Sequence, residues 1–290
     1  MLRSMFAAVS GLRSHQTMMD VTGNNIANVN TSGYKAQRTT FQETLTQLVR
    51  GGTQGQPGDA GGQNPLQVGL GVQVAATDLI FVQGASQVTG RETDVAIQGD
   101  GFFTVQGPNE TTFYARSGAF SWDSAGQLVT PNGEMVLGYD VDPNGDALGT
   151  GNDNPPTFVV TMDPAEYTDV TIDSTGRVIG RSTGVVAGET AGEPVVKFQL
   201  GMARFANTGG LERAGNGLFT GSLAAGDPIY GTAGGDTGHG VLQAGTLEMS
   251  NVDLAAEFTN LIMAQRGFQA NARTITTSDE LLQELVNLKR

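Results

Sequence analysis

The sequence predicts a mainly β fold with terminal α-helices. The N- and C-terminal helices are expected to pair as a coiled coil, and the centre to form an antiparallel β domain. Apolar side chains recur at heptad spacing near both termini, which is typical of helices that pack lengthwise. Short strand-like runs separated by turn residues fill the middle. Glycine provides 42 of the 290 residues, about twice its average usage, which indicates many turns.

The N-terminal helix is predicted from residues 1–28. Alternate steps of three and four residues from Leu2 reach mostly apolar side chains, and Gln16 and Gly23 interrupt the series. The apolar members of this predicted seam are Leu2, Met5, Val9, Leu12, Met19 and Ile26. The alternative interpretation is an amphipathic helix that packs on the chain's own globular core.

The C-terminal helix is predicted from about residue 252 to the end of the sequence. Ser250 followed by Asp253 resembles a capping box at its start. Gln265 and Asp279 interrupt the same alternation of three and four residues, and such imperfect seams suggest that neighbouring copies complete the packing. The main apolar members of this second predicted seam are Leu254, Phe258, Leu261, Phe268, Ile275 and Leu282.

Three domain segments follow from these patterns. Residues 1–50 with 242–290 are expected to form the terminal helical domain, residues 51–72 an extended linker, and residues 73–241 the central β domain. The linker begins with a stretch that has no apolar side chain larger than alanine. Strand-like runs in the centre are 72–75, 95–97, 102–105, 135–141, 158–161, 170–172 and 195–200. Predicted turns are 123–126, 131–133, 142–145 and 173–176.

Composition argues against several partner classes. Sixteen Lys and Arg against 29 Asp and Glu give a net charge of −13, so nucleic acid and anionic membranes are poor partners. The sequence has no cysteine, which excludes disulfides and thiolate metal sites. No run of 18 apolar residues occurs, so no membrane insertion is expected. The first residues also lack the apolar core of a cleaved secretory signal.

Catalytic and metal-binding patterns are weak, and we expect no enzyme, no cofactor and no metal site. Residues 140–146 match the first positions of a calcium loop, but the twelfth position is Gly151 rather than a bidentate Glu, so a turn explains them better. His15 and His239 have no neighbours that suggest a triad or a metal site. No Gly-x-x-x-x-Gly-Lys phosphate loop is present.

Several segments resemble the bacterial flagellar rod and hook family. They are VTGNNIANVNTSGYK at 21–35, DVAIQGDGFF at 94–103, YARSGAF at 114–120, and residues 248–271 and 276–290 at the C-terminus. The resemblance spans both ends and the start of the β domain, and it is loose between about 145 and 235. It implies a structural subunit in a tubular assembly, with terminal helices lining the inner wall and the β domain outside.

Within that family, residues 64–72 and 284–290 are similar to hook subunits. We therefore expect a hook subunit that self-assembles into a flexible joint transmitting torque from rod to filament. Implied partners are further copies in a helical tube, rod and hook–filament junction proteins, the hook cap and the flagellar type III export apparatus. Export would place the protein outside the cell, in the hook or basal body.

Two alternatives to the hook remain open. A distal-rod subunit is the first, because 290 residues leave little room for the additional outer β domain of many hook proteins. A secreted β-rich adhesin or carbohydrate binder with coiled-coil termini is the second, since acidity and Asp/Asn/Gly turns are compatible with it.

Overall fold

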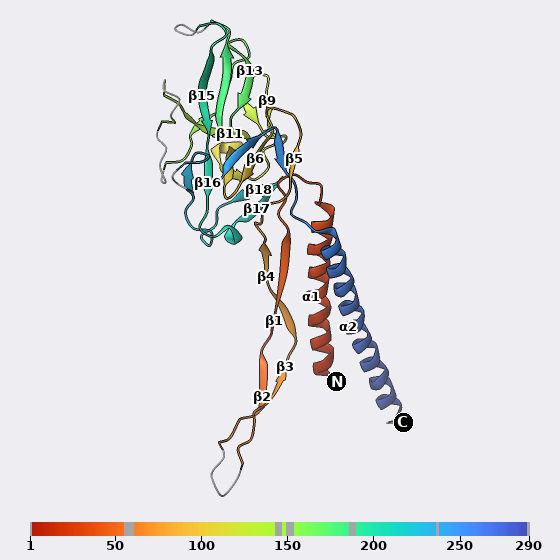
Figure 1. Cartoon of the computed structure of the whole chain (residues 1–290). Coiled ribbons are helices and arrows are strands. Elements are labelled where there is room, and N and C mark those ends of the chain that lie inside the picture. The colour runs from red at the N-terminus through yellow and green to blue at the C-terminus, as the bar shows by residue number, and fades with distance from the viewer. Residues whose placement is uncertain are drawn as a thin grey trace. The chain divides into compact units, whose positions relative to one another are not determined.

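The computed structural model describes residues 2–54, 61–142, 147–148, 154–185, 190–235 and 238–288 (Figure 1). Within these residues the chain is mainly β, with one long helix near each end and a central antiparallel sheet. This confirms the predicted fold class at that level. The chain forms two compact units, called unit 1 and unit 2 here. Unit 1 contains Met1–Ala27, Gln37–Ile80 and Val252–Arg290, and unit 2 contains Asn28–Ala36 and Phe81–Asn251.

Unit 1 combines the two helices with a long two-stranded ribbon. The β1–β4 and β2–β3 pairs are both antiparallel, so the chain runs out along β1 and β2 and returns along β3 and β4 (Figure 1). Part of the predicted linker 51–72 thus lies in strands, namely residues 66–69 and residue 72. The elements of unit 1 are α1 Leu2–Ala27, β1 Gln37–Glu43, β2 Thr46–Arg50, β3 Leu66–Gly69, β4 Val72–Leu79 and α2 Leu254–Leu288.

The first turn of α2 is capped by Asp253. Its Oδ1 accepts hydrogen bonds from the backbone N–H groups of Ala255 and Ala256 at 2.9 and 3.3 Å. An aspartate in this position satisfies N–H groups that have no partner within the helix and favours the positive end of the helix dipole. The cap is thus the second residue of the predicted Ser250–Asp253 pair.

Unit 2 is built on one large antiparallel sheet. Its main strand order is β13-β14-β15-β11-β7-β8-β18-β17, and the β20–β6 and β21–β5 pairs stand apart from it. Its first strands are β5 Ser86–Val88, β6 Val95–Gln98, β7 Phe102–Gln106, β8 Thr112–Ala115, β9 Ser121–Trp122, β10 Leu128–Val129, β11 Met135–Asp140, β12 Phe158–Val159 and β13 Tyr167–Ile172. The later strands are β14 Arg177–Ser182, β15 Pro194–Leu200, β16 Met202–Arg204, β17 Glu212–Gly215, β18 Leu218–Thr220, β19 Ile229–Gly231, β20 Val241–Ala244 and β21 Thr246–Glu248. Short 3-10 turns occupy Pro108–Glu110 and Thr208–Gly210.

Aspartate and glycine close the predicted hairpin turns of unit 2. At Asp123 and at Asp173, the carbonyl oxygen accepts a hydrogen bond from the glycine three residues later, at 2.9 Å in both cases. Gly126 and Gly176 have φ values of +75° and +78°, which glycine adopts without steric cost. Residues 143–146 of the calcium-like segment lie outside the described residues.

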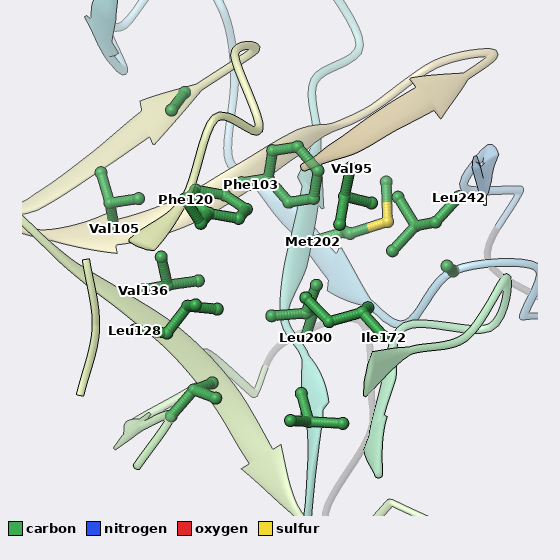
Figure 2. Packing of buried hydrophobic residues seen from close by; sticks show 14 of the residues in the cluster. Val95, Phe103, Val105, Phe120, Leu128, Val136, Ile172, Leu200, Met202 and Leu242 are labelled. Atoms are coloured by element: carbon green, nitrogen blue, oxygen red, sulfur yellow. The ribbon is translucent and has the colours of Figure 1, made fainter. Parts of the chain in front are cut away.

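The core of unit 2 fills the space around the main sheet (Figure 2). Phe103 and Phe120 pack edge to face with ring centroids 5.1 Å apart. Val95, Leu128 and Leu200 are fully buried close by. Consecutive residues of the central strands, such as Phe102 and Phe103 on β7, are both buried, so these strands are covered on both faces.

Candidate assembly surface

The two helices of unit 1 lie side by side (Figure 1), and they approach each other closely at two glycines. A Cβ atom on Gly11 of α1 would lie 2.6 Å from Nδ2 of Asn271. A Cβ on Gly267 of α2 would lie 2.5 Å from the imidazole of His15. Each glycine therefore leaves room for a polar side chain of the facing helix, which brings the two backbones together.

The buried face of α1 is made of small and polar residues. Ala8, Gly11, Ser14, Thr22 and Asn25 are buried. Most of them lie one residue before a position of the predicted apolar alternation. Because successive residues of a helix are about 100° apart around its axis, the buried face is rotated by about that angle from the predicted seam. Small residues occupy this face because α2 and the ribbon strands β1 and β4 all pack against α1.

The predicted seam residues are distributed between this contact region and the surface. Eight are half-buried: Met5, Leu12, Met19, Ile26, Leu261, Phe268, Ile275 and Leu282. Val9, Leu254 and Phe258 are exposed. The side chain of Leu2 lies outside the described part of the structure. The role of all twelve as assembly residues stays a prediction.

Unit 1 exposes many large apolar side chains. Leu254, Phe258 and Ile262 follow one another at four-residue spacing on α2, so they form one exposed stripe. Phe6 is 71% exposed and Leu45 is 81% exposed. Other exposed apolar residues of unit 1 are Phe41, Leu48, Val49, Leu66, Val68, Leu70, Met263, Leu281, Leu285, Val286 and Leu288. Exposed apolar side chains gathered in this way mark protein–protein contact, and together they are called the candidate assembly surface here.

Asn25 fixes the point where α1 ends and the ribbon begins. Its Nδ2 donates hydrogen bonds to the backbone oxygen of Gln37 at 2.8 Å and to Oε1 of Glu257 at 2.9 Å. Its Oδ1 accepts the backbone N–H of Gln37 at 3.0 Å. One buried amide thus connects α1, β1 and α2. Asn25 lies in the segment 21–35 that resembles the family. The search for an apolar alternation did not identify it, because its side chain is polar.

Unit 2 contains a buried charge cluster of Lys35, Arg116 and Glu248. Both Lys35 Nζ and Arg116 Nε lie 2.6 Å from the carboxylate oxygens of Glu248. Gly84 N–H also donates to Glu248 at 2.8 Å, and Arg116 donates to the backbone oxygens of Gly99 and Gly101. Hydrogen bonding and charge pairing of this completeness allow ionised groups to be buried.

The cluster shifts the pKa values of Glu248 and Lys35. Burial opposes ionisation of Glu248, but Arg116 and Lys35 outweigh it and hold the pKa of this carboxyl below its ordinary value. Burial lowers the pKa of Lys35, although Glu248 opposes the change. The three residues lie in three separate motifs of the sequence, 213 and 132 positions apart along the chain in the two ion pairs, so no local periodicity could pair them.

The two histidines have separate surroundings. His15 lies between the helices of unit 1, where its Nδ1 is buried and has no hydrogen-bond partner among the described residues. Nε2 of His239 in unit 2 lies 3.1 Å from the backbone oxygen of Ile229, and burial lowers the pKa of this residue. Among the residues that the structure describes, no three His, Asp or Glu side chains gather as metal ligands would. No described helix is long and apolar enough to cross a membrane.

Three family models match segments of the chain. "Flagella basal body rod protein" matches residues 5–35, which include most of α1 and the segment that follows it. "Flagellar hook protein FlgE/F/G D1 domain" matches residues 96–180 of unit 2, and "Flagellar basal body rod FlgEFG protein C-terminal" matches residues 243–288, including α2. The basal-body rod protein FlgG of Bacillus subtilis is 43% identical over 290 residues, with both chains covered completely.

The chain belongs to the flagellar rod and hook family. FlgG of Borreliella burgdorferi is 38% identical over 295 residues, with complete coverage of both chains. The hook protein FlgE of Treponema pallidum is 30% identical over 466 residues, again with complete coverage. These relatives confirm the resemblance seen in the sequence. The protein is a short-form structural member of the family and a component of the flagellum.

Proposed function

We propose that this family member is a subunit of the basal-body rod, which self-assembles into a helical tube. The match in length to rod relatives carries this proposal. FlgG proteins align with the whole chain over 290 and 295 residues, close to its own length. The alignments with hook proteins extend over 466 and 445 residues, so those proteins contain long segments without a counterpart here.

A hook subunit is the second candidate. Hook proteins of Treponema pallidum and Borreliella burgdorferi are 30% and 31% identical and cover the chain completely. Residues 64–72 and 284–290, which are similar to hook subunits, favour the same function. In either case we propose the partners expected from the sequence: further copies, neighbouring rod or hook-junction proteins, the cap and the export apparatus.

Assembly is proposed to use the exposed apolar side chains of unit 1. The Leu254, Phe258 and Ile262 stripe faces solvent in the single chain, whereas Leu261 and Phe268 are half-buried. We infer that α1 and α2 pair as a coiled coil whose outer face is covered by neighbouring copies. Covering one large apolar side chain contributes about 1.5–3 kcal/mol, and the contribution repeats at every subunit.

Labelled basal bodies test the choice between rod and hook. A short epitope inserted between residues 216 and 217, in the exposed turn between β17 and β18, leaves unit 1 intact. Electron microscopy with labelled antibody should place the epitope on the straight rod within the cell envelope. Label on the external curved segment would overturn the rod proposal and support the hook. Absence of label from every flagellar structure would contradict both.

A further inference from the structure

A pocket in unit 2 gathers three of the chain's 16 basic residues. Lys35, Arg116 and Arg204 line it, together with one carboxylate, Asp100. The cavity has a volume of about 340 Å³. Part of its wall is aromatic, formed by Phe81, Phe102 and Phe205. For a chain of net charge −13, this is an unusual concentration of positive charge.

Two of these cations are largely satisfied. The ammonium of Lys35 donates to Glu248 at 2.6 Å and to the backbone oxygen of Val82 at 2.8 Å, which uses two of its three N–H groups. Arg116 is paired with Glu248 through Nε and with backbone oxygens through both terminal nitrogens. Glu248 therefore balances one of these two positive charges, and backbone oxygens accept the remaining hydrogen bonds.

Arg204, at the end of β16, is different. Within the described residues it has no hydrogen bond or ion pair, and its Nε is buried without a partner. A buried N–H group that lacks an acceptor costs about 1–3 kcal/mol. The guanidinium nevertheless lines the pocket, where a bound group could supply the missing acceptors.

The chemistry of the pocket fits a carboxylate. A planar guanidinium binds a carboxylate with two parallel hydrogen bonds, and the aromatic wall strengthens them by lowering the local dielectric. Asp100 places one negative charge in the same lining. This charge disfavours a doubly charged anion such as phosphate more strongly than a singly charged carboxylate.

We propose that this pocket binds an aspartate or glutamate side chain presented by a second copy of the chain. The proposal rests on the proposed self-assembly. Each copy has 29 acidic residues against 16 basic ones, so copies repel unless a carboxylate of one meets a cation of the next. An unpaired arginine in a preformed pocket provides such a meeting point.

Binding is tested first on the full-length monomer, with propionate, a monocarboxylate, as a probe for a glutamate side chain. The NMR signal of Arg204 Nε–H should shift saturably, and Arg204→Gln should weaken propionate binding by about tenfold or more. The matched control is Arg181→Gln, which removes an exposed charge of unit 2 and should change binding by less than about twofold. No saturable shift, equal binding by Arg204→Gln, or tighter binding of inorganic phosphate than of propionate would overturn the proposal.

Association of full-length copies tests the occupant. Arg204→Gln should raise the concentration needed for sedimentable assemblies by about tenfold, whereas Arg181→Gln should not. Arg204→Lys keeps the positive charge but cannot form two parallel hydrogen bonds to a carboxylate. If the Gln variant does not fold, the Lys variant replaces it in the same assembly measurement. Propionate binding combined with unchanged assembly of the variants would refute a second copy as occupant. Failure of the wild type to assemble would count against the proposed function, while the propionate result would still stand.

Discussion

At the scale of single residues, Glu248 holds together three parts of unit 2. Its carboxylate accepts hydrogen bonds from Lys35, Arg116 and Gly84, which lie in segments far apart along the chain. The side chain is 1% exposed, so water cannot replace a missing partner. Removing one member of such a cluster leaves the remaining charges buried without compensation.

Glu248→Gln should therefore destabilise unit 2 strongly. We expect a loss of about 3–5 kcal/mol in the free energy of unfolding, because Lys35 and Arg116 keep their charges and lose their counter-ion. Urea unfolding followed by the fluorescence of Trp122, the one tryptophan in the sequence, measures it. Glu212→Gln, an exposed change on β17, should remain within about 0.5 kcal/mol of wild type. Equal effects of the two substitutions would contradict the role assigned to the cluster.

Acid should remove the contribution of Glu248. Its pKa in the folded chain lies below the ordinary value of 4.5, because Arg116 and Lys35 outweigh the effect of burial. The contribution is therefore fully present above about pH 4.5 and is lost as the pH falls through the folded-state pKa. The stability difference between wild type and Glu248→Gln should narrow in urea titrations from pH 6 down to about pH 3. A difference that stays constant over this range would show that Glu248 does not titrate as inferred.

At the scale of elements, the helix pair depends on where its glycines lie. A Cβ atom added to Gly267 would meet the His15 imidazole, whereas one added to Gly23 on α1 would have no neighbouring atom within 4 Å. Alanine is the better helix former by about 1 kcal/mol, so the same substitution should have opposite effects at the two sites.

Gly23→Ala should stabilise unit 1 by about 0.5–1 kcal/mol, because it gains helix propensity and meets no neighbour. Gly267→Ala should instead destabilise it by about 1–3 kcal/mol, since His15 must move away from the new methyl group. Thermal melts followed by circular dichroism at 222 nm distinguish the two. Stabilisation by both substitutions would show that the His15 side chain moves aside without loss of stability.

Substitutions at two phenylalanines of α2 distinguish assembly between copies from pairing of the two helices. Phe258 is exposed and Phe268 is half-buried. Phe258→Asp should prevent polymerisation while leaving the helix content of the monomer unchanged, because the new charge meets only the contact surface of neighbouring copies. Phe268→Asp should reduce both. Normal tubes from Phe258→Asp would show that the exposed stripe is not an assembly surface.

The element scale also shows how far the sequence could predict the structure. Both helices and the strand-like runs around Phe103 and Leu200 followed from periodicity, because neighbouring residues carry that signal. The buried face of α1 did not follow, since Ala8 and Gly11 contribute little to a hydrophobic pattern. The ribbon strands β1–β3 were missed because most of their side chains are exposed and lack a buried alternation. The Lys35–Glu248 pair depends on long-range folding alone.

At the scale of the whole molecule, the division into two units predicts two unfolding transitions. Both long helices lie in unit 1 and Trp122 lies in unit 2, so circular dichroism at 222 nm and tryptophan fluorescence report on different units. Phe268→Asp should lower the midpoint seen at 222 nm and leave the fluorescence midpoint unchanged within about 1 °C. A shift of both midpoints together would show that the chain unfolds as a single cooperative unit.

The Asn25 contacts have a consequence for the order in which the chain is completed. Asn25 and Glu257 are 232 positions apart, and Lys35 and Glu248 are 213 positions apart. A ribosome releases the N-terminal residue of each pair long before its partner. Neither unit can make these contacts until nearly the whole polypeptide has been synthesised, and contacts of such sequence separation form slowly because a long loop must close first. These two links between the ends of the chain therefore form only after the segment that contains Glu248 and Glu257 has been synthesised.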